Sequence, residues 1–201
     1  MEHIEIEFKM LLDESLFHQI LKDYKEKITD TYQQTNYYLF HPELEKRRYS
    51  LRIREKKGNY ELTLKRPAKE GLKELNLDIN QEIKEMIFNH QEISNEIFDL
   101  LKEEKIYIKD LQCGDYLTTV RHDILLPDGM LSLDENEYNH HHDYEMEFEV
   151  NDSKKGLETF KEIIKPYHLH YTSNCPSKIK RLLQTKNQWF NNHWFFLKMH
   201  S

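Results

Sequence analysis

The feature that most constrains this chain is the alternation of apolar and charged residues in several separate segments. In the stretch 3–10, apolar residues occupy every second position, and mostly glutamate or lysine stands between them. A period of two places successive side chains on opposite faces of a β-strand. Further strands are predicted at 29–40, 47–56, 59–66, 115–126, 129–137 and 142–150. We therefore expect a β-rich protein in which many strands have one apolar and one charged face.

Helical patterns separate these strands. Asp13 can cap a helix over 13–25, and apolar residues recur at helical spacing within 80–105. A helix is expected from Asp152 or Ser153 to about Lys165, and another is expected to open near Pro176. Turns are predicted at Lys57–Asn59 and Pro127–Gly129, and His41–Pro42 is expected to end the strand 29–40. The order of elements predicts an α+β fold.

A chain of 201 residues without a Pro/Gly/Ser-rich linker suits one domain with a sizeable core. We expect the domain to span 1–185 and an aromatic-rich tail to occupy 186–201. Tail residues such as Trp189 and Trp194 are expected to pack on the chain's own domain or on a second copy, with a membrane surface as the alternative. A homodimer is therefore left open.

Charge and cysteine content narrow the function classes. The net charge is −7, which disfavours a general nucleic-acid binder because phosphate backbones need a surplus of lysine and arginine. Cys113 and Cys175 lack metal-finger spacing, as expected for reduced thiols. No signal peptide is recognised at the N-terminus, and no apolar stretch approaches the roughly 20 residues of a membrane span. A cytoplasmic location is expected.

The charged strand faces mix acids and bases. A face of this kind on a single strand usually meets solvent, but here several strands carry one in a fixed order. If they point into a common hollow, the hollow must be wet and hold a ligand, because buried unpaired charge is costly. Carboxylates suit Mg²⁺ or Mn²⁺, and arginine and lysine suit phosphate oxygens. Metal ligands and phosphate-binding residues in one site are the groups that phosphoryl transfer requires.

The ordered motifs resemble those of the CYTH domain family, the triphosphate-tunnel metalloenzymes. Glu5-Ile6-Glu7-Phe8-Lys9 resembles the family's N-terminal ExExK signature. The resemblance continues over roughly 3–183 through Leu51–Arg54, Leu62–Lys65, Thr119–Arg121, Asp134, Glu145–Glu147 and Ser177–Lys178. ExExK alone is a weak signal, whereas the ordered set is specific.

The resemblance implies an eight-stranded antiparallel barrel that is open as a tunnel, with helices outside. It implies metal ligands at Glu5, Glu7, Asp134, Glu145 and Glu147, and triphosphate contacts at Lys9, Arg52, Arg54, Lys65, Arg121 and Lys178. Catalytic roles would fall to Glu5, Glu7, Lys9, Glu145 and Glu147. One metal ion, Mg²⁺ or Mn²⁺, would orient the phosphates, and a second would activate a water.

The expected activity is metal-dependent hydrolysis of a small-molecule triphosphate, either inorganic or organic. A class IV-type adenylate cyclase and a non-catalytic polyphosphate- or nucleotide-binding module are the alternatives. Glu74 is the one candidate for a further acidic strand near 72–76, and no role is assigned to it. His140–His142 is expected to lie in a solvated turn, with transition-metal binding as the alternative. Cys113 is interpreted as structural or incidental.

Overall fold

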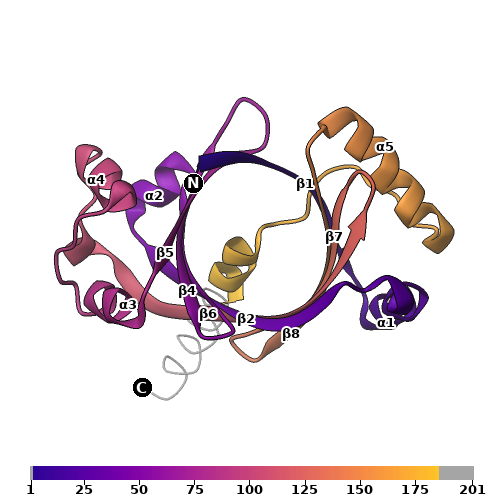
Figure 1. The fold of residues 1–201 in the computed structure, drawn as a ribbon, viewed down its shortest axis with the longest axis horizontal. Coiled ribbons are helices and arrows are strands. Elements are labelled where there is room, and N and C mark those ends of the chain that lie inside the picture. The colour runs from indigo at the N-terminus through magenta and orange to yellow at the C-terminus, as the bar shows by residue number, and fades with distance from the viewer. Residues whose placement is uncertain (1, 186–201) are drawn as a thin grey trace, which may run out of the picture.

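A computed structural model describes residues 2–185 of the chain. Its eight strands form a closed antiparallel barrel in the order β1-β5-β4-β3-β2-β6-β7-β8 (Figure 1). The strands are β1 (Glu2–Leu12), β2 (Asp30–Phe40), β3 (Ser50–Lys56), β4 (Asn59–Pro67), β5 (Leu72–Ile79), β6 (Gln112–Leu126), β7 (Gly129–Tyr138) and β8 (His141–Val150). This confirms the fold expected from the sequence.

β1 closes the barrel because its two halves pair with different neighbours. Glu2–Glu5 pair with β5, whereas Ile6–Leu12 pair with β8. After Glu5, the edge of β1 that faces β5 therefore no longer pairs with that strand. Asn174 and Cys175 occupy part of that edge: the Lys9 backbone N–H donates to Asn174 Oδ1 at 2.8 Å, and the Cys175 N–H donates to the Lys9 carbonyl at 3.2 Å.

Helices cover the outside of the barrel. They are α1 (Glu14–Asp23), α2 (Pro42–Arg47), α3 (Gln81–Phe88), α4 (Glu96–Glu103) and α5 (Ser153–Ile164), and residues 178–185 are also helical. The side chains of Asp13, Asn80, Asn95 and Asp152 accept hydrogen bonds from backbone N–H groups in the first turns of α1, α3, α4 and α5. Figure 1 shows α2–α4 on one side of the barrel and α1 with α5 on the other.

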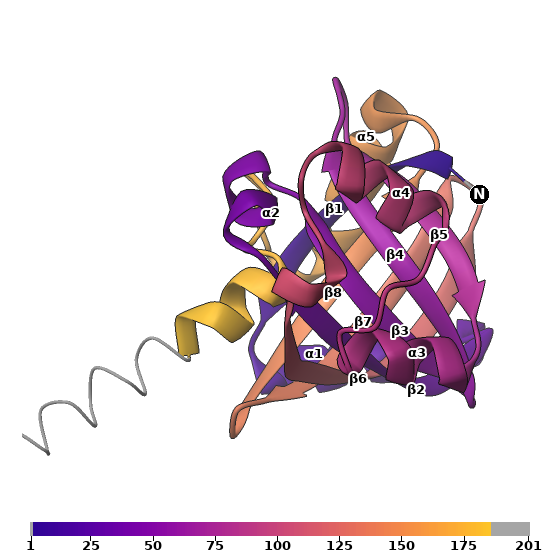
Figure 2. The ribbon, with the colours of Figure 1, turned by 90° about the vertical axis from the view of Figure 1, so that its left-hand side faces the viewer.

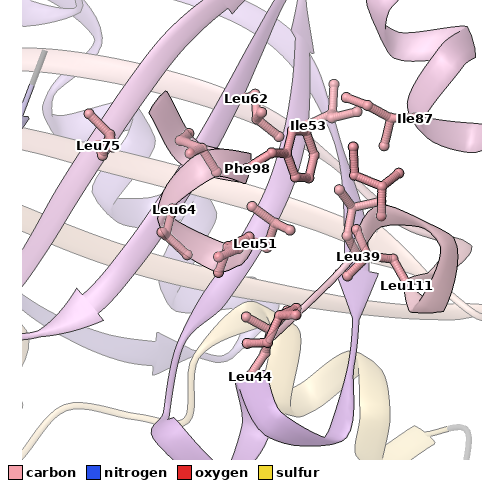
Figure 3. Packing of buried hydrophobic residues seen from close by; sticks show 14 residues of the cluster. Leu39, Leu44, Leu51, Ile53, Leu62, Leu64, Leu75, Ile87, Phe98 and Leu111 are labelled. Carbon is pink, nitrogen blue, oxygen red and sulfur yellow. The ribbon is translucent and has the colours of Figure 1, made fainter. Parts of the chain in front are cut away.

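The apolar core lies between the barrel wall and these helices. On one side, Leu51 and Ile53 of β3 belong to a buried cluster with Ile87 of α3 and Phe98 of α4 (Figure 3). A second cluster joins β7 and β8 to α1 and α5. Since apolar side chains of the strands face the helices, the alternate, charged side chains face the lumen.

The structure corrects the predicted element boundaries in several places. Residues 42–47 form a helix, so β3 begins at Ser50 rather than at residue 47. The helical pattern of 80–105 is two helices, α3 and α4. His141 and His142 belong to β8, so the turn is confined to Asn139 and His140, which both have positive φ. β5, which the sequence only hinted at, is a full strand of 8 residues.

Within residues 2–185 there is no helix with the length and apolar character needed to cross a membrane. The expected packing of the aromatic tail falls on 186–201, outside the described residues.

Candidate functional site: a charged tunnel

The barrel encloses a cavity of about 1010 Å³ that runs through its charged lumen. Its lining includes most residues predicted from the sequence, namely Glu5, Glu7, Lys9, Arg52, Arg54, Lys65, Arg121, Glu147 and Lys178. The other two, Asp134 and Glu145, are fully buried beside it. The structure thus brings residues from seven separate segments of the chain into one site.

Three carboxylates form the most compact acidic group of this site. Asp134, Glu145 and Glu147 each offer an oxygen, and these oxygens lie within 4.8 Å of one another. β7 and β8 bring them together, because Asp134 is opposite Glu145 in the strand register and Glu147 is two residues further along β8. Three oxygen ligands at this spacing suit a hard divalent cation.

Basic side chains neutralise this carboxylate trio. Lys178 Nζ lies 2.8 Å from Asp134, 2.6 Å from Glu145 and 2.7 Å from Glu147. Arg121 donates to both Asp134 oxygens, at 2.7 and 2.6 Å, and also pairs with Glu147. Burial opposes both positive charges, but the carboxylates outweigh it and raise the pKa of Lys178 and of Arg121 well above their usual values.

Lys178 reaches the trio because the chain before it is fixed to β1. Asn174 Nδ2 donates to the Glu7 carbonyl at 2.9 Å, in addition to accepting from the Lys9 N–H. The helical residues 178–185, in yellow in Figure 1, then project into the outline of the barrel. The predicted Ser177–Lys178 pair therefore lies at the point where the C-terminal segment enters the tunnel.

A second ionic group lies where β1 meets β4 and β5. Lys65 Nζ is 2.5 Å from Glu5 and 2.8 Å from Glu74, and Lys9 pairs with Glu7 on the same face of β1. Burial disfavours the ionised form of Glu74, but Lys65 and Arg52 outweigh it and lower its pKa to about 2. Burial disfavours the ionised form of Glu5 more than the attraction of Lys65 favours it. Repulsion from Glu7 and Glu74 acts in the same direction as burial, so the pKa of Glu5 is raised.

Arg52 and Arg54 on β3 are different, because neither forms an ion pair with any described carboxylate. Arg54 Nε donates to Asn36 Oδ1 at 3.0 Å, and the buried Arg52 Nε has no hydrogen-bond partner in the part of the chain that the structure describes. Burial, then Arg52 and Arg121, lower the pKa of Arg54 to about 10. Carboxylates such as Glu74 attract these arginines without a direct ion pair, so an anion placed on this wall would still be attracted to them.

Unused polar groups surround these arginines on β2. Asn36 is fully buried, and its Nδ2 has no hydrogen-bond partner among the described residues. Gln34 is 2% exposed, and within residues 2–185 neither its Nε2 nor its Oε1 has a partner. Buried amides of this kind are costly unless something bonds to them, which again points to a ligand beside Arg54.

Sequence reasoning missed part of the site. Glu74 binds Lys65, although no role was assigned to it. Arg181 is 6% exposed and pairs with Asp143 and Glu145, each at 2.8 Å. Arg181 follows Lys178 by three residues on a helix, so both side chains lie on one face. This spacing is the sequence signal that could have identified Arg181.

The polyhistidine stretch stays outside the tunnel. His140 and His142 line a separate cavity of about 490 Å³ with Glu135 and Glu137 of β7. Among residues 2–185, the trio in the tunnel is the one group whose ligand atoms converge closely enough to hold a metal ion. Transition-metal binding by these histidines therefore receives no support from the geometry.

An eight-stranded barrel whose lumen gathers carboxylates and arginines from many strands defines a charged-tunnel protein. The chain belongs to the CYTH domain family, whose model matches residues 3–181. It is 30% identical over 191 residues to "Putative triphosphatase YjbK" of Bacillus subtilis strain 168, covering 93% of this chain and 98% of that protein.

Solved structures agree with this assignment. A protein of Bacillus halodurans titled a "putative adenylate cyclase" superposes with a TM-score of 0.82 at 32% identity, over 90% of this chain and 97% of its own. A Hippeastrum protein titled a "putative adenylyl cyclase" that reveals a dominant triphosphatase activity superposes with a TM-score of 0.70. It is 22% identical over 90% of this chain and 96% of its own, and supports the fold.

Proposed function

We propose that this protein hydrolyses a triphosphate with the help of divalent metal ions bound in its tunnel. The observation that carries the proposal is the division of one lumen into two walls. β3 presents Arg52 and Arg54, which form no ion pair with the carboxylates of residues 2–185, and β7 with β8 presents the carboxylate trio. A polyanion on the first wall would lie in the same lumen as metal ligands on the second. The name of the Bacillus subtilis relative supports the same activity.

The basic residues would divide the work of binding the substrate. Arg52 and Arg54 can donate several N–H groups to phosphate oxygens, with the spare amide of Asn36 beside them. Lys65 and Lys9 would add charge from β4 and β1. Arg121 and Lys178 are paired with carboxylates in the structure. When the substrate is bound, some of their N–H groups would donate to the phosphates instead.

The acidic residues fit Mg²⁺ or Mn²⁺, because the donor set consists of carboxylate oxygens. Asp134, Glu145 and Glu147 would hold one ion, and Glu5 and Glu7 would contribute from β1. Such ions neutralise phosphate charge and lower the pKa of a bound water. The chain itself would hold the phosphates in place. Burial disfavours the ionised forms of Asp134 and Glu147, but Arg121 and Lys178 outweigh it and lower the pKa of both carboxyl groups.

Single-turnover release of phosphate from a triphosphate, with Mg²⁺ or Mn²⁺ added to metal-stripped protein, tests this proposal. We expect release that depends on the metal and is lost in Glu145→Gln. Formation of cyclic AMP from ATP without phosphate release would show a cyclase instead. Tight binding without any product would show a binding module.

A further inference from the structure

Gln34 of β2 is a buried amide whose side-chain nitrogen and oxygen have no hydrogen-bond partner within residues 2–185. The residue is 2% exposed, and its side chain lines the tunnel cavity. A primary amide has two N–H donors and an acceptor oxygen, and leaving both ends unpaired in a buried place is costly. Native proteins seldom keep such a group unless a ligand or an ordered water completes it. We therefore asked what Gln34 contacts when the tunnel is filled.

The two residues opposite Gln34 in the sheet are engaged with other groups. Thr119 is its register partner on β6, and the Thr119 hydroxyl donates to Asn136 Oδ1 at 2.7 Å. Lys56 is its register partner on β3, and Lys56 Nζ lies 3.3 Å from the centre of the Tyr32 ring. The protein groups nearest to Gln34 in the sheet are thus already used, which leaves a ligand as the partner of the amide.

The position of Gln34 between two arginines indicates the charge of that ligand. β2 lies between β3 and β6 in the closed barrel, which Figure 2 shows from the side. Arg54 of β3 and Arg121 of β6 are the diagonal neighbours of Gln34 in the strand register, one toward each end of β2. After burial and Arg52, Arg121 is the next cause that lowers the pKa of Arg54 to about 10, as expected for like charges that repel across a short distance. An anion beside Gln34 would relieve this repulsion.

A phosphate group matches one end of the amide, and water matches the other. Ionised phosphate oxygens only accept hydrogen bonds, so they suit the Nε2 donors of Gln34 but not its Oε1 acceptor. Oε1 needs a donor, and a water molecule bound beside the phosphate supplies one. Gln34 also adds hydrogen bonds to such a ligand without adding a third positive charge to Arg54 and Arg121.

We propose that Gln34 is a substrate-contact residue, whose Nε2 donates to a phosphate oxygen between Arg54 and Arg121 and whose Oε1 accepts a hydrogen bond from water bound beside that phosphate. This inference rests on the proposed function and adds a neutral residue to the same site. Gln34 then connects the β3 wall to Arg121, which itself pairs with Asp134 and Glu147 of the carboxylate trio.

Calorimetric titration with a triphosphate analogue whose bridging oxygens are replaced by methylene groups tests the inference, because this probe binds without turnover. Metal-loaded wild type, Gln34→Met and Gln34→Glu are compared, and each is also melted without the probe. Gln34→Met keeps the length of the side chain and removes its unpaired polar atoms, so we expect a higher melting temperature and an affinity weaker by roughly 10-fold or more. Gln34→Glu places a negative charge between the arginines and should weaken binding further.

Gln33→Met is the matched control, because Gln33 precedes Gln34 on β2, is exposed and lines the separate cavity near His140. We expect it to leave the affinity for the probe unchanged. Gln34→Met that binds the probe as tightly as the wild type would overturn the inference and leave the proposed function standing. A lower melting temperature of Gln34→Met would also overturn it, because the amide would then have a partner in the protein. Failure of folded, metal-loaded wild type to bind the probe would overturn the proposed function as well.

Discussion

The ammonium group of Lys178 lies 2.6 Å from a carboxylate oxygen of Glu145, inside the trio of acids that could hold a metal ion. The same nitrogen is within 2.8 Å of Asp134 and 2.7 Å of Glu147. A cation tethered to the C-terminal segment thus contacts the same carboxylates that could hold an inorganic cation. Metal binding and the position of the C-terminal segment are therefore expected to be coupled.

Lys178→Met should destabilise the metal-free protein, because three buried carboxylates would lose a shared cation. Removal of one partner of a buried ion pair costs about 3–5 kcal/mol, and a drop in the free energy of unfolding of that order is expected. Thermal melting with and without Mn²⁺ checks this. Added Mn²⁺ should raise the melting temperature of the variant more than that of the wild type. Equal increases in the two proteins would show that Lys178 does not compete with the metal ion. Lys161→Met, on the exposed side of α5, is the control.

Arg54→Ala should weaken triphosphate binding while the barrel survives. Arg54 has no carboxylate partner among the described residues, so its loss leaves no acidic group unpaired. A hydrogen bond to a charged group contributes about 1.5–3 kcal/mol, so the dissociation constant should rise roughly 10- to 100-fold. Calorimetry measures it, with Lys22→Ala on the exposed surface of α1 as the control. Unchanged affinity would remove Arg54 from the site.

Glu74 should contribute to the acid sensitivity of the fold. Its pKa is about 2 in the folded protein, below the ordinary value of 4.5, because Lys65 and Arg52 outweigh burial. The unfolded chain therefore binds more protons between these two pH values, and stability is lost as the pH falls from about 4.5 toward 2. Glu74→Gln should flatten urea-unfolding curves against pH in this window. The exposed Glu158→Gln should retain the slope, and an equal slope in Glu74→Gln would contradict the assignment.

Gly71→Ala should disturb the site through the backbone of β1. A Cβ at Gly71 would lie 2.1 Å from the Glu5 carbonyl oxygen, and Gly71 has a φ of +67°. Gly58 has a similar φ of +77° but open space around it, so Gly58→Ala measures the backbone strain alone. Gly71→Ala should lower the melting temperature further than Gly58→Ala and weaken metal binding. Equal effects of the two changes would show that the contact with β1 can relax.

The sequence predicted most strands because period-two alternation is a local property that a strand shows by itself, whereas the closed eight-stranded barrel was expected from the CYTH resemblance. Lys9 with Glu5 and Glu7, or Arg52 with Arg54, share a face by spacing alone. The role of Glu74 was harder to predict, since β5 is recognisable as part of the site only when it pairs with β1 and β4. The ion pairs of Arg181 with Asp143 and Glu145 depend on how the C-terminal segment enters the barrel, which no local pattern encodes.

The sequence likewise could not predict which of the inward arginines form ion pairs and which do not. Arg54 and Arg121 look equivalent as inward arginines on strands, yet Arg121 is held by Asp134 and Glu147. Arg54 donates instead to the neutral Asn36 amide, and no carboxylate of residues 2–185 forms an ion pair with it. That difference, which makes the β3 wall the place for an anion, arises from the order of strands around the barrel.

If the two walls of the tunnel act together on a triphosphate, phosphate release must depend on both. Single-turnover release at saturating Mn²⁺ measures this dependence in the wild type, the double variant Arg52→Ala/Arg54→Ala and Glu145→Gln. We expect rapid release by the wild type, weak substrate binding by the double variant, and binding with little release by Glu145→Gln. Folded, metal-loaded wild type that releases no phosphate from any triphosphate, or variants that release it as fast as the wild type, would contradict it.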